Sequence, residues 1–210
     1  MRLGNLTRVL IGFDLDMTLA DSRSGIVVTM DALSAETGVP IDSALVVARL
    51  GPPLEREIAQ WFPAEEVEAM TGRYRELYGE IGVTGAVPMP GAVASVRAVR
   101  ERGGRVAVVT AKHPKHAATM LDHLGMRPDV LVGGRFAHAK GEELRELGAD
   151  VYVGDHLGDV DAARTAGAYG VGVATGPFTA AELIDYGADA ALETLADFPG
   201  WLGGYVKGTR

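Results

Sequence analysis

Short apolar, β-branched runs alternate with amphipathic stretches along most of this chain. The runs predict strands near residues 9–13, 105–109, 129–132, 150–153, 169–173 and 189–192. The stretches between them predict helices near residues 91–102, 114–124, 141–147, 159–166 and 179–186. Such alternation is typical of a parallel sheet with helices on both of its faces. The sequence therefore predicts an α/β fold with a doubly wound, Rossmann-like parallel sheet.

About eighty residues separate the first two predicted strands, which is too long for a simple crossover connection. In this interval apolar side chains recur at helical spacing, at Ile26, Met30 and Leu33 and again at Val67, Met70, Tyr74, Leu77, Tyr78 and Ile81. We expect residues 22–87 to form an inserted α-helical cap domain, and residues 1–21 and 88–210 to form the core domain. A cap on two linkers can open for a ligand and close to exclude water.

The first predicted strand is followed by two carboxylates and a hydroxyl at alternate positions, Asp14, Asp16 and Thr18. The carboxyl ends of parallel strands form the crevice in which ligands bind. Asp and Thr are also ordinary turn residues, so the segment alone leaves both interpretations open. It is typical of a phosphoryl-transfer site, and three later segments supply the other groups that this chemistry needs.

The later segments each stand at a predicted strand end or helix start. Thr110 follows the run 105–109 and can donate its hydroxyl and its backbone N–H to a phosphate oxygen. Lys140 is one of only four lysines and stands at the start of a predicted helix. Asp155 and Asp159 follow the strand near 150–153, and two carboxylates beyond one strand end suit an octahedral Mg²⁺ site.

With these segments in this order, the chain resembles the haloacid dehalogenase superfamily of phosphotransferases over nearly its whole length, and its later part is similar to the phosphoglycolate phosphatase branch. The resemblance implies a set of site residues, namely the nucleophile Asp14, the general acid and base Asp16, the phosphate ligands Thr110, Ala111 and Lys140, and the Mg²⁺ ligands Asp14, Asp16, Asp155 and Asp159. In such an enzyme the nucleophilic carboxylate forms an aspartyl phosphate, which water then hydrolyses.

Three positions depart from the pattern of that superfamily. Met17 stands where many members have glycine, and Ala111 where Asn or Ser is frequent. Gly141 follows Lys140 in place of proline. The interval between Lys140 and the next predicted strand leaves room for only a two-turn helix. Lys112 is therefore a second candidate for part of the role given to Lys140.

Arg49 and Arg56 flank a Gly-Pro-Pro turn at residues 51–53, in a segment similar to the one that faces the active site in phosphoglycolate phosphatase relatives. Either arginine could bind a substrate carboxylate through two hydrogen bonds and so determine substrate specificity. The alternative is that both are solvated and paired with Glu55 or Glu57.

The composition fits a soluble cytoplasmic enzyme. The net charge of −8 argues against a nucleic-acid surface. No apolar segment approaches the roughly 20 residues needed to span a bilayer, and Arg8 and Asp14 come too early for a secretory signal. The absence of cysteine excludes disulfides and thiolate ligands or nucleophiles. The histidines at positions 113, 116, 123 and 138 lack metal-site spacing, and we expect them to be non-ligands.

These observations predict a Mg²⁺-dependent phosphatase that acts on a small phosphorylated metabolite, with phosphoglycolate or a related compound as the leading candidate. We expect a monomer or homodimer without nucleic-acid or membrane partners. A phosphomutase of the β-phosphoglucomutase kind, a nucleotidase and a non-catalytic phosphate-responsive module are the alternatives. Asp16 argues against the last of these, because it would have no purpose there.

Overall fold

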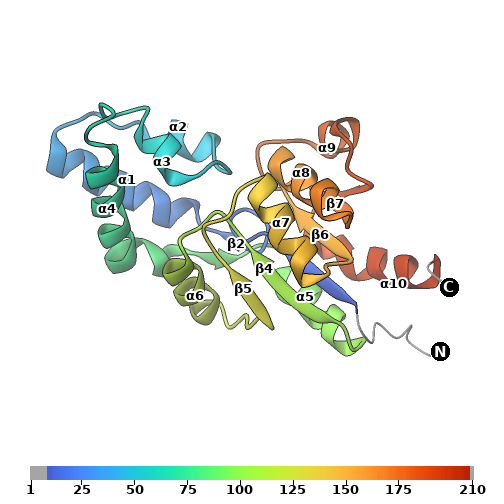
Figure 1. The fold of residues 1–210 in the computed structure, drawn as a ribbon. Helices are drawn as coiled ribbons and strands as arrows, with labels where there is room; N and C mark the ends of the chain where they lie inside the picture. The colour runs from blue at the N-terminus through green and yellow to red at the C-terminus, as the bar shows by residue number, and fades with distance from the viewer. Residues whose placement is uncertain (1–8, 209–210) are drawn as a thin grey trace.

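The computed structural model describes residues 9–208, and its centre is a six-stranded sheet (Figure 1). The strands are β1 (Leu10–Phe13), β4 (Arg105–Val109), β5 (Val130–Val132), β6 (Val151–Gly154), β7 (Tyr169–Val173) and β8 (Ala190–Leu192). They lie in the order β5-β4-β1-β6-β7-β8, and all neighbours are parallel. The strand order changes direction around β1, so the carboxyl ends of β1, β4 and β6 meet at the place where such sheets bind ligands.

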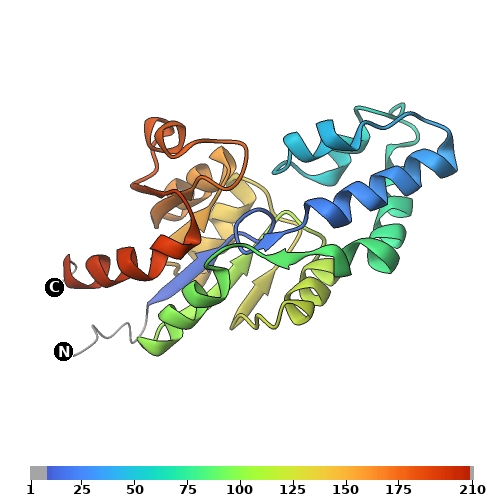
Figure 2. The same ribbon diagram turned by 180° about the vertical axis from the view of Figure 1, so that it is seen from behind.

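Helices cover both faces of this sheet (Figures 1 and 2). One face carries α7 (His138–Leu147), α8 (Leu157–Ala166) and α9 (Ala180–Tyr186). The other carries α5 (Ala92–Glu101), the short 3-10 helix η3 (Leu195–Asp197) and the last helix, α10 (Phe198–Gly208). Helix α6 (Pro114–His123) connects β4 to β5. The doubly wound α/β sheet expected from the sequence is confirmed.

The chain is helical between two short strands, β2 (Ala20–Asp21) and β3 (Val87–Pro88), which pair antiparallel. It forms α1 (Arg23–Thr37), α2 (Ser43–Ala48), α3 (Leu54–Ile58), α4 (Val67–Leu77), the π-helix η1 (Tyr78–Gly82) and the 3-10 helix η2 (Val83–Gly85). Both views place α1 to α4 to one side of the sheet (Figures 1 and 2). We call them the cap helices; their assignment to a separate domain at residues 22–87 stays a prediction, and residues 1–8 and 209–210 of the expected core domain, with Arg8, lie outside the described residues.

A single hydrophobic cluster joins the cap helices to the sheet. It contains Phe13 and Val108 of the sheet together with Ile26, Met30 and Tyr78 from the predicted cap at residues 22–87. Within residues 9–208, no helix combines the length and the apolar character needed to cross a membrane.

Two elements differ from the expectations. Helix α7 has ten residues because it begins at His138, so the expected start at residue 141 was wrong, although the part after Lys140 is as short as expected. The strained residue Ala137, with φ 46° and ψ −115°, turns the chain into this helix. Helix α10 was not expected, and its Phe198 packs edge-on against Phe13 of β1 at 5.3 Å between ring centres.

Candidate active site

Three carboxylates meet where β1 and β6 end. Asp14 follows β1, Asp155 follows β6, and Asp159 lies in the first turn of α8. All three side chains are buried, and one oxygen of each lies within 4.8 Å of the others. The N–H of Asp14 donates to the carbonyl of Val153 at 2.9 Å, which fixes the end of β1 against β6. The acids at two predicted strand ends therefore form one cluster, which we call the acid cluster.

Lys140 is the cation of the acid cluster. Its buried Nζ lies 2.7 Å from Asp159 Oδ1 and 3.0 Å from Asp14 Oδ1. Burial works to lower the pKa of Lys140, but the charges of Asp14 and Asp159 outweigh it and raise that pKa. The lysine is therefore charged at neutral pH. If all three carboxylates were ionised, one ammonium would leave an excess of two negative charges in this buried place.

The acid cluster resists ionisation when it holds no cation. Burial raises the pKa of Asp14 to about 6, with Lys140 lowering it in part and Asp159 raising it further. Burial, followed by the charges of Asp159 and Asp14, raises the pKa of Asp155 well above its usual range. Three buried carboxylates with a single ammonium among them fit a hard divalent cation such as Mg²⁺, whose charge would let all three ionise.

Two distant segments hold Asp155 in place. Thr18, fully buried in the loop after β1, donates its hydroxyl to Asp155 Oδ1 at 2.7 Å. Gly176 approaches the other oxygen so closely that a Cβ there would lie 2.0 Å from Asp155 Oδ2. Met17, which precedes Thr18 in the loop after β1, has φ 61°, a conformation that glycine adopts without strain. This explains physically why glycine suits that position in similar proteins.

Asp16 lies outside the acid cluster. Nζ of Lys112 donates to both of its carboxylate oxygens, at 2.9 and 3.1 Å. The same Nζ lies 4.5 Å from the centre of the Tyr78 ring. The two lysines thus contact different acids, Lys140 in the acid cluster and Lys112 on Asp16. The assignment of Asp16 as a metal ligand stays a prediction.

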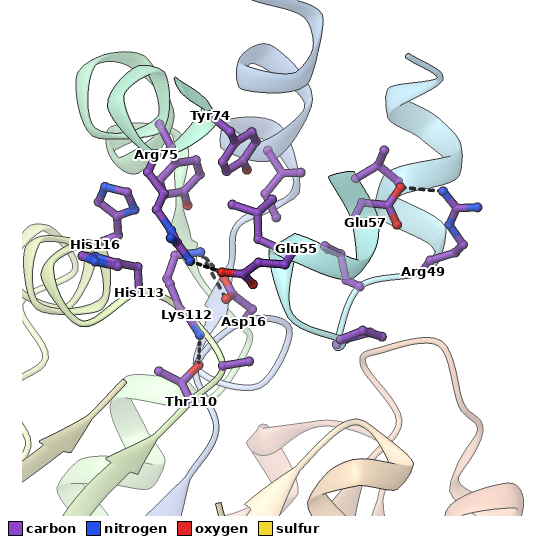
Figure 3. A pocket seen from close by; sticks show the side chains of 18 of the residues that line it. Asp16, Arg49, Glu55, Glu57, Tyr74, Arg75, Thr110, Lys112, His113 and His116 are labelled. Carbon is purple, nitrogen blue, oxygen red and sulfur yellow. Dashed lines mark hydrogen bonds and ion pairs between the residues drawn. The ribbon is translucent and has the colours of Figure 1, made fainter. Parts of the chain in front are cut away.

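A pocket opens between the strand ends and the cap helices, and Asp14, Asp16, Thr110 and Ala111 line it on the core side (Figure 3). Thr110 follows β4 and is buried. Its N–H donates to the carbonyl of Val132 at 2.9 Å, so this N–H is not available to a phosphate, contrary to the expectation. Its hydroxyl oxygen accepts the N–H of the second residue on, at 3.2 Å, which leaves the hydroxyl proton free to be donated.

The two arginines expected to select the substrate lie in different places. Arg49 lines the pocket, but its Nη2 pairs with Glu57 Oε1 at 2.5 Å and its guanidinium lies 5.9 Å from the centre of the Trp61 ring. Arg56 is not among the pocket-lining residues and lies 5.5 Å from the centre of the Phe136 ring. The role of both in specificity stays a prediction.

Gly51, between these two arginines, is a close contact of the cap segment with the core. A Cβ at Gly51 would lie 2.5 Å from Cδ2 of His156, and its φ is 132°. The His156 side chain accepts a hydrogen bond from the N–H of Gly158 at 3.0 Å, and its backbone N–H donates to Asp159 Oδ2 at 3.1 Å. Residues 22–87 therefore reach His156, the N-cap residue of α8, which also holds Asp159 of the acid cluster.

Sequence reasoning missed three side chains that line the pocket, Arg75, His113 and His116. Arg75 extends from α4 and pairs with Glu55 at 2.5 Å (Figure 3). Burial lowers the pKa of His116 to about 4, so this imidazole is neutral at pH 7. The histidines come just after a strand end, which is a signal that could have found them, whereas no signal in the sequence indicates Arg75.

Two family models match the chain. The model described as haloacid dehalogenase-like hydrolase matches residues 11–140, and a second one, described as HAD-hydrolase-like, matches residues 136–198.

Curated and solved relatives agree with these matches. A phosphoglycolate phosphatase of Caulobacter vibrioides is 28% identical over 94% of this chain and 92% of its own length, and one of Rhodospirillum rubrum is 29% identical over 91% and 89%. A solved haloacid dehalogenase-like family protein of Streptococcus pneumoniae superposes with a TM-score of 0.80, covering 94% of this chain and 97% of its own at 24% identity. The chain belongs to the haloacid dehalogenase-like hydrolases, and its relatives indicate a phosphatase.

Proposed function

We propose that this protein is a Mg²⁺-dependent phosphatase that hydrolyses a small phosphate monoester, such as phosphoglycolate, through a phosphorylated Asp14. The observation that carries the proposal is the acid cluster, which ends two central strands and has Asp14 on the wall of the pocket. Phosphoglycolate is the substrate in the names of two relatives, and the small acidic ester is carried over from them.

In the first step, a carboxylate oxygen of Asp14 attacks the phosphorus and the bond to the ester oxygen breaks. Asp16 donates a proton to the leaving oxygen. In the second step, Asp16 takes a proton from water, the water oxygen attacks the aspartyl phosphate, and Asp14 and inorganic phosphate are released. When bound to Asp14, Asp155 and Asp159, Mg²⁺ would offset the repulsion between a carboxylate and a phosphate dianion.

The remaining core residues orient the phosphate and the acid. Lys140 holds Asp14 and Asp159 and supplies positive charge beside the transferred phosphoryl group. The Thr110 hydroxyl and the backbone at Ala111 line the pocket and would bind phosphate oxygens. Lys112 fixes the Asp16 carboxylate through both oxygens, which keeps the proposed acid in one orientation.

The test is phosphate release from an aryl phosphate and from phosphoglycolate, with Mg²⁺ and with excess chelator. We expect turnover that requires Mg²⁺, and we expect Asp14→Asn to lose at least about 1000-fold because the nucleophile is removed. Intact-mass measurement after a rapid acid quench should detect a phosphorylated wild-type protein and no phosphorylated variant. Turnover by Asp14→Asn close to that of the wild type would contradict the mechanism.

The same assays separate the alternatives. Transfer of phosphate to a sugar hydroxyl would indicate a mutase, preference for nucleoside monophosphates a nucleotidase, and binding of phosphate without turnover a non-catalytic module. We further propose a cytoplasmic monomer or homodimer without nucleic-acid or membrane partners, which size-exclusion chromatography with light scattering and cell fractionation would check.

A further inference from the structure

The pocket contains three cationic side chains among the described residues, and each is paired with a carboxylate. The pairs are Arg49 with Glu57, Arg75 with Glu55 and Lys112 with Asp16. A ligand with a negative group besides its phosphate can bind to the pocket wall only where one of these pairs opens. The contacts around each pair therefore determine what the pocket can select.

Two of the pairs are held by further contacts. The Glu57 side chain is only 15% exposed, and its Oε1 also accepts a hydrogen bond from Trp61 Nε1 at 2.9 Å. The Lys112 side chain is only 9% exposed, contacts both oxygens of Asp16, and lies over the Tyr78 ring. Opening either pair would leave a buried charge without a partner, which is costly.

The ion pair between Arg75 and Glu55 is the one that a ligand can open most easily. The Glu55 side chain is 48% exposed and the Arg75 side chain 35%, and Arg75 is the hydrogen-bonding partner of the Glu55 carboxylate within the described residues. Exposed ion pairs of this kind contribute little to stability. Arg75 also has an unused donor, because its Nε is buried without a hydrogen bond. Figure 3 shows its side chain reaching from α4 toward Asp16 and Lys112, with Glu55 beside it.

We propose that Arg75 binds a carboxylate of the phosphate ester substrate, and that Glu55 occupies this position until the substrate displaces it. The inference rests on the proposed function and assigns its specificity to one side chain. Glu55 shows the chemistry that Arg75 takes, since it already places a carboxylate on the guanidinium. A substrate carboxylate could use the free Nε together with a terminal nitrogen, and such two-point pairing is the geometry in which arginine binds carboxylates best. Once displaced, Glu55 can turn to solvent.

The experiment compares two substrates of the same length, phosphoglycolate and 2-hydroxyethyl phosphate, which has a neutral CH₂OH group in place of the carboxylate. The measured quantity is the ratio of their kcat/KM values. We expect Arg75→Ala to lower this ratio by about 10- to 100-fold, because it removes a contact made by the acidic substrate alone. We expect Glu55→Gln to raise it by about 3- to 10-fold through a lower KM for phosphoglycolate, because the internal competitor is lost.

Two controls make the result specific. Arg73→Ala, on the same helix, removes an arginine that pairs with Glu36 and Glu76 and does not line the pocket, so it should leave the ratio unchanged. In the Arg75→Ala background, Glu55→Gln should no longer raise the ratio.

Equal losses on both substrates in Arg75→Ala would mean that the pair only braces the cap helices, and an unchanged ratio would mean that another group binds the carboxylate. Either result overturns the inference and leaves the phosphatase proposal standing. A wild-type protein that hydrolyses neither these esters nor an aryl phosphate would overturn the proposed function itself.

Discussion

The ionised carboxylate of Asp155 destabilises the folded state of the metal-free protein. Its pKa is raised well above the usual range, and that of Asp14 is raised to about 6, so the folded state holds protons that the unfolded chain has already released. These groups therefore lower the free energy of unfolding as pH rises above about 4, for Asp14 up to about pH 6, and the loss persists at higher pH. For Asp14 the shift from 3.8 to about 6 corresponds to about 3 kcal/mol.

Asp155→Asn should for this reason make the metal-free fold more stable at pH 8, by about 1–3 kcal/mol, while it weakens Mg²⁺ binding. Near pH 4 the difference should vanish, because the acid is then protonated. Urea unfolding in chelator at the two pH values measures this, with Asp31→Asn, at an exposed position, as the control. A variant less stable than the wild type at pH 8 would show that the contact from Thr18 outweighs the charge.

Among the elements, helix α7 is preceded by a strained residue. Ala137 has φ 46° and ψ −115°, a conformation that costs a residue with a Cβ on the order of 1–3 kcal/mol and glycine far less. Ala137→Gly should raise the free energy of unfolding by about 1 kcal/mol, after the added flexibility of the unfolded chain is counted. Ala139→Gly, inside the same helix, should lower it by about the same amount. Urea unfolding of both variants checks the prediction, which is contradicted if they change in the same direction.

The elements that sequence could predict are those with a local cause. Strands β1, β4 and β6 are continuous apolar runs, and the position of Asp14, Thr110 and Asp155 after them follows from the parallel sheet. Helix α10 has apolar residues at helical spacing, but glycines at 200, 203 and 204 hide it, and packing against the sheet decides its structure.

Contacts between distant segments could not be predicted in this way. Lys112 and Lys140 differ only in which acid the tertiary fold brings to them. Arg75 faces the pocket because of how α4 sits above the strand ends, and no spacing in the sequence encodes that orientation. The positions of the core side chains at the strand ends could therefore be predicted, and those of the cap side chains could not.

For the molecule as a whole, the contact between Gly51 and His156 limits how closely the cap helices approach the acid cluster. Gly51→Ala would place a methyl group 2.5 Å from His156 Cδ2, so either the ring or the cap helices must shift. Because the N–H of Gly158 holds the His156 ring at 3.0 Å, we expect the cap helices to move outward. We expect kcat/KM to fall on the order of 10- to 100-fold, because the pocket walls no longer meet the substrate together. Small-angle scattering should show a larger radius of gyration.

Gly38→Ala is the matched control for this change. Gly38 has φ 72°, so alanine is strained there as well, but its Cβ would meet nothing within 4 Å. It should lower stability without affecting the rate or the radius. If the two variants behave alike, backbone strain and not the contact with His156 is responsible.

The hydrophobic cluster that joins the cap helices to the sheet limits how this protein can be re-engineered. A chimaera that takes residues 22–87 from another member of the family would cut the cluster between Ile26, Met30 and Tyr78 on one side and Phe13 and Val108 on the other. Grafted side chains of other volumes would meet a sheet surface shaped for these residues, with cavities or overlaps at the seam. Exchange of substrate preference by swapping caps therefore requires the apolar partners in the sheet to be exchanged with them.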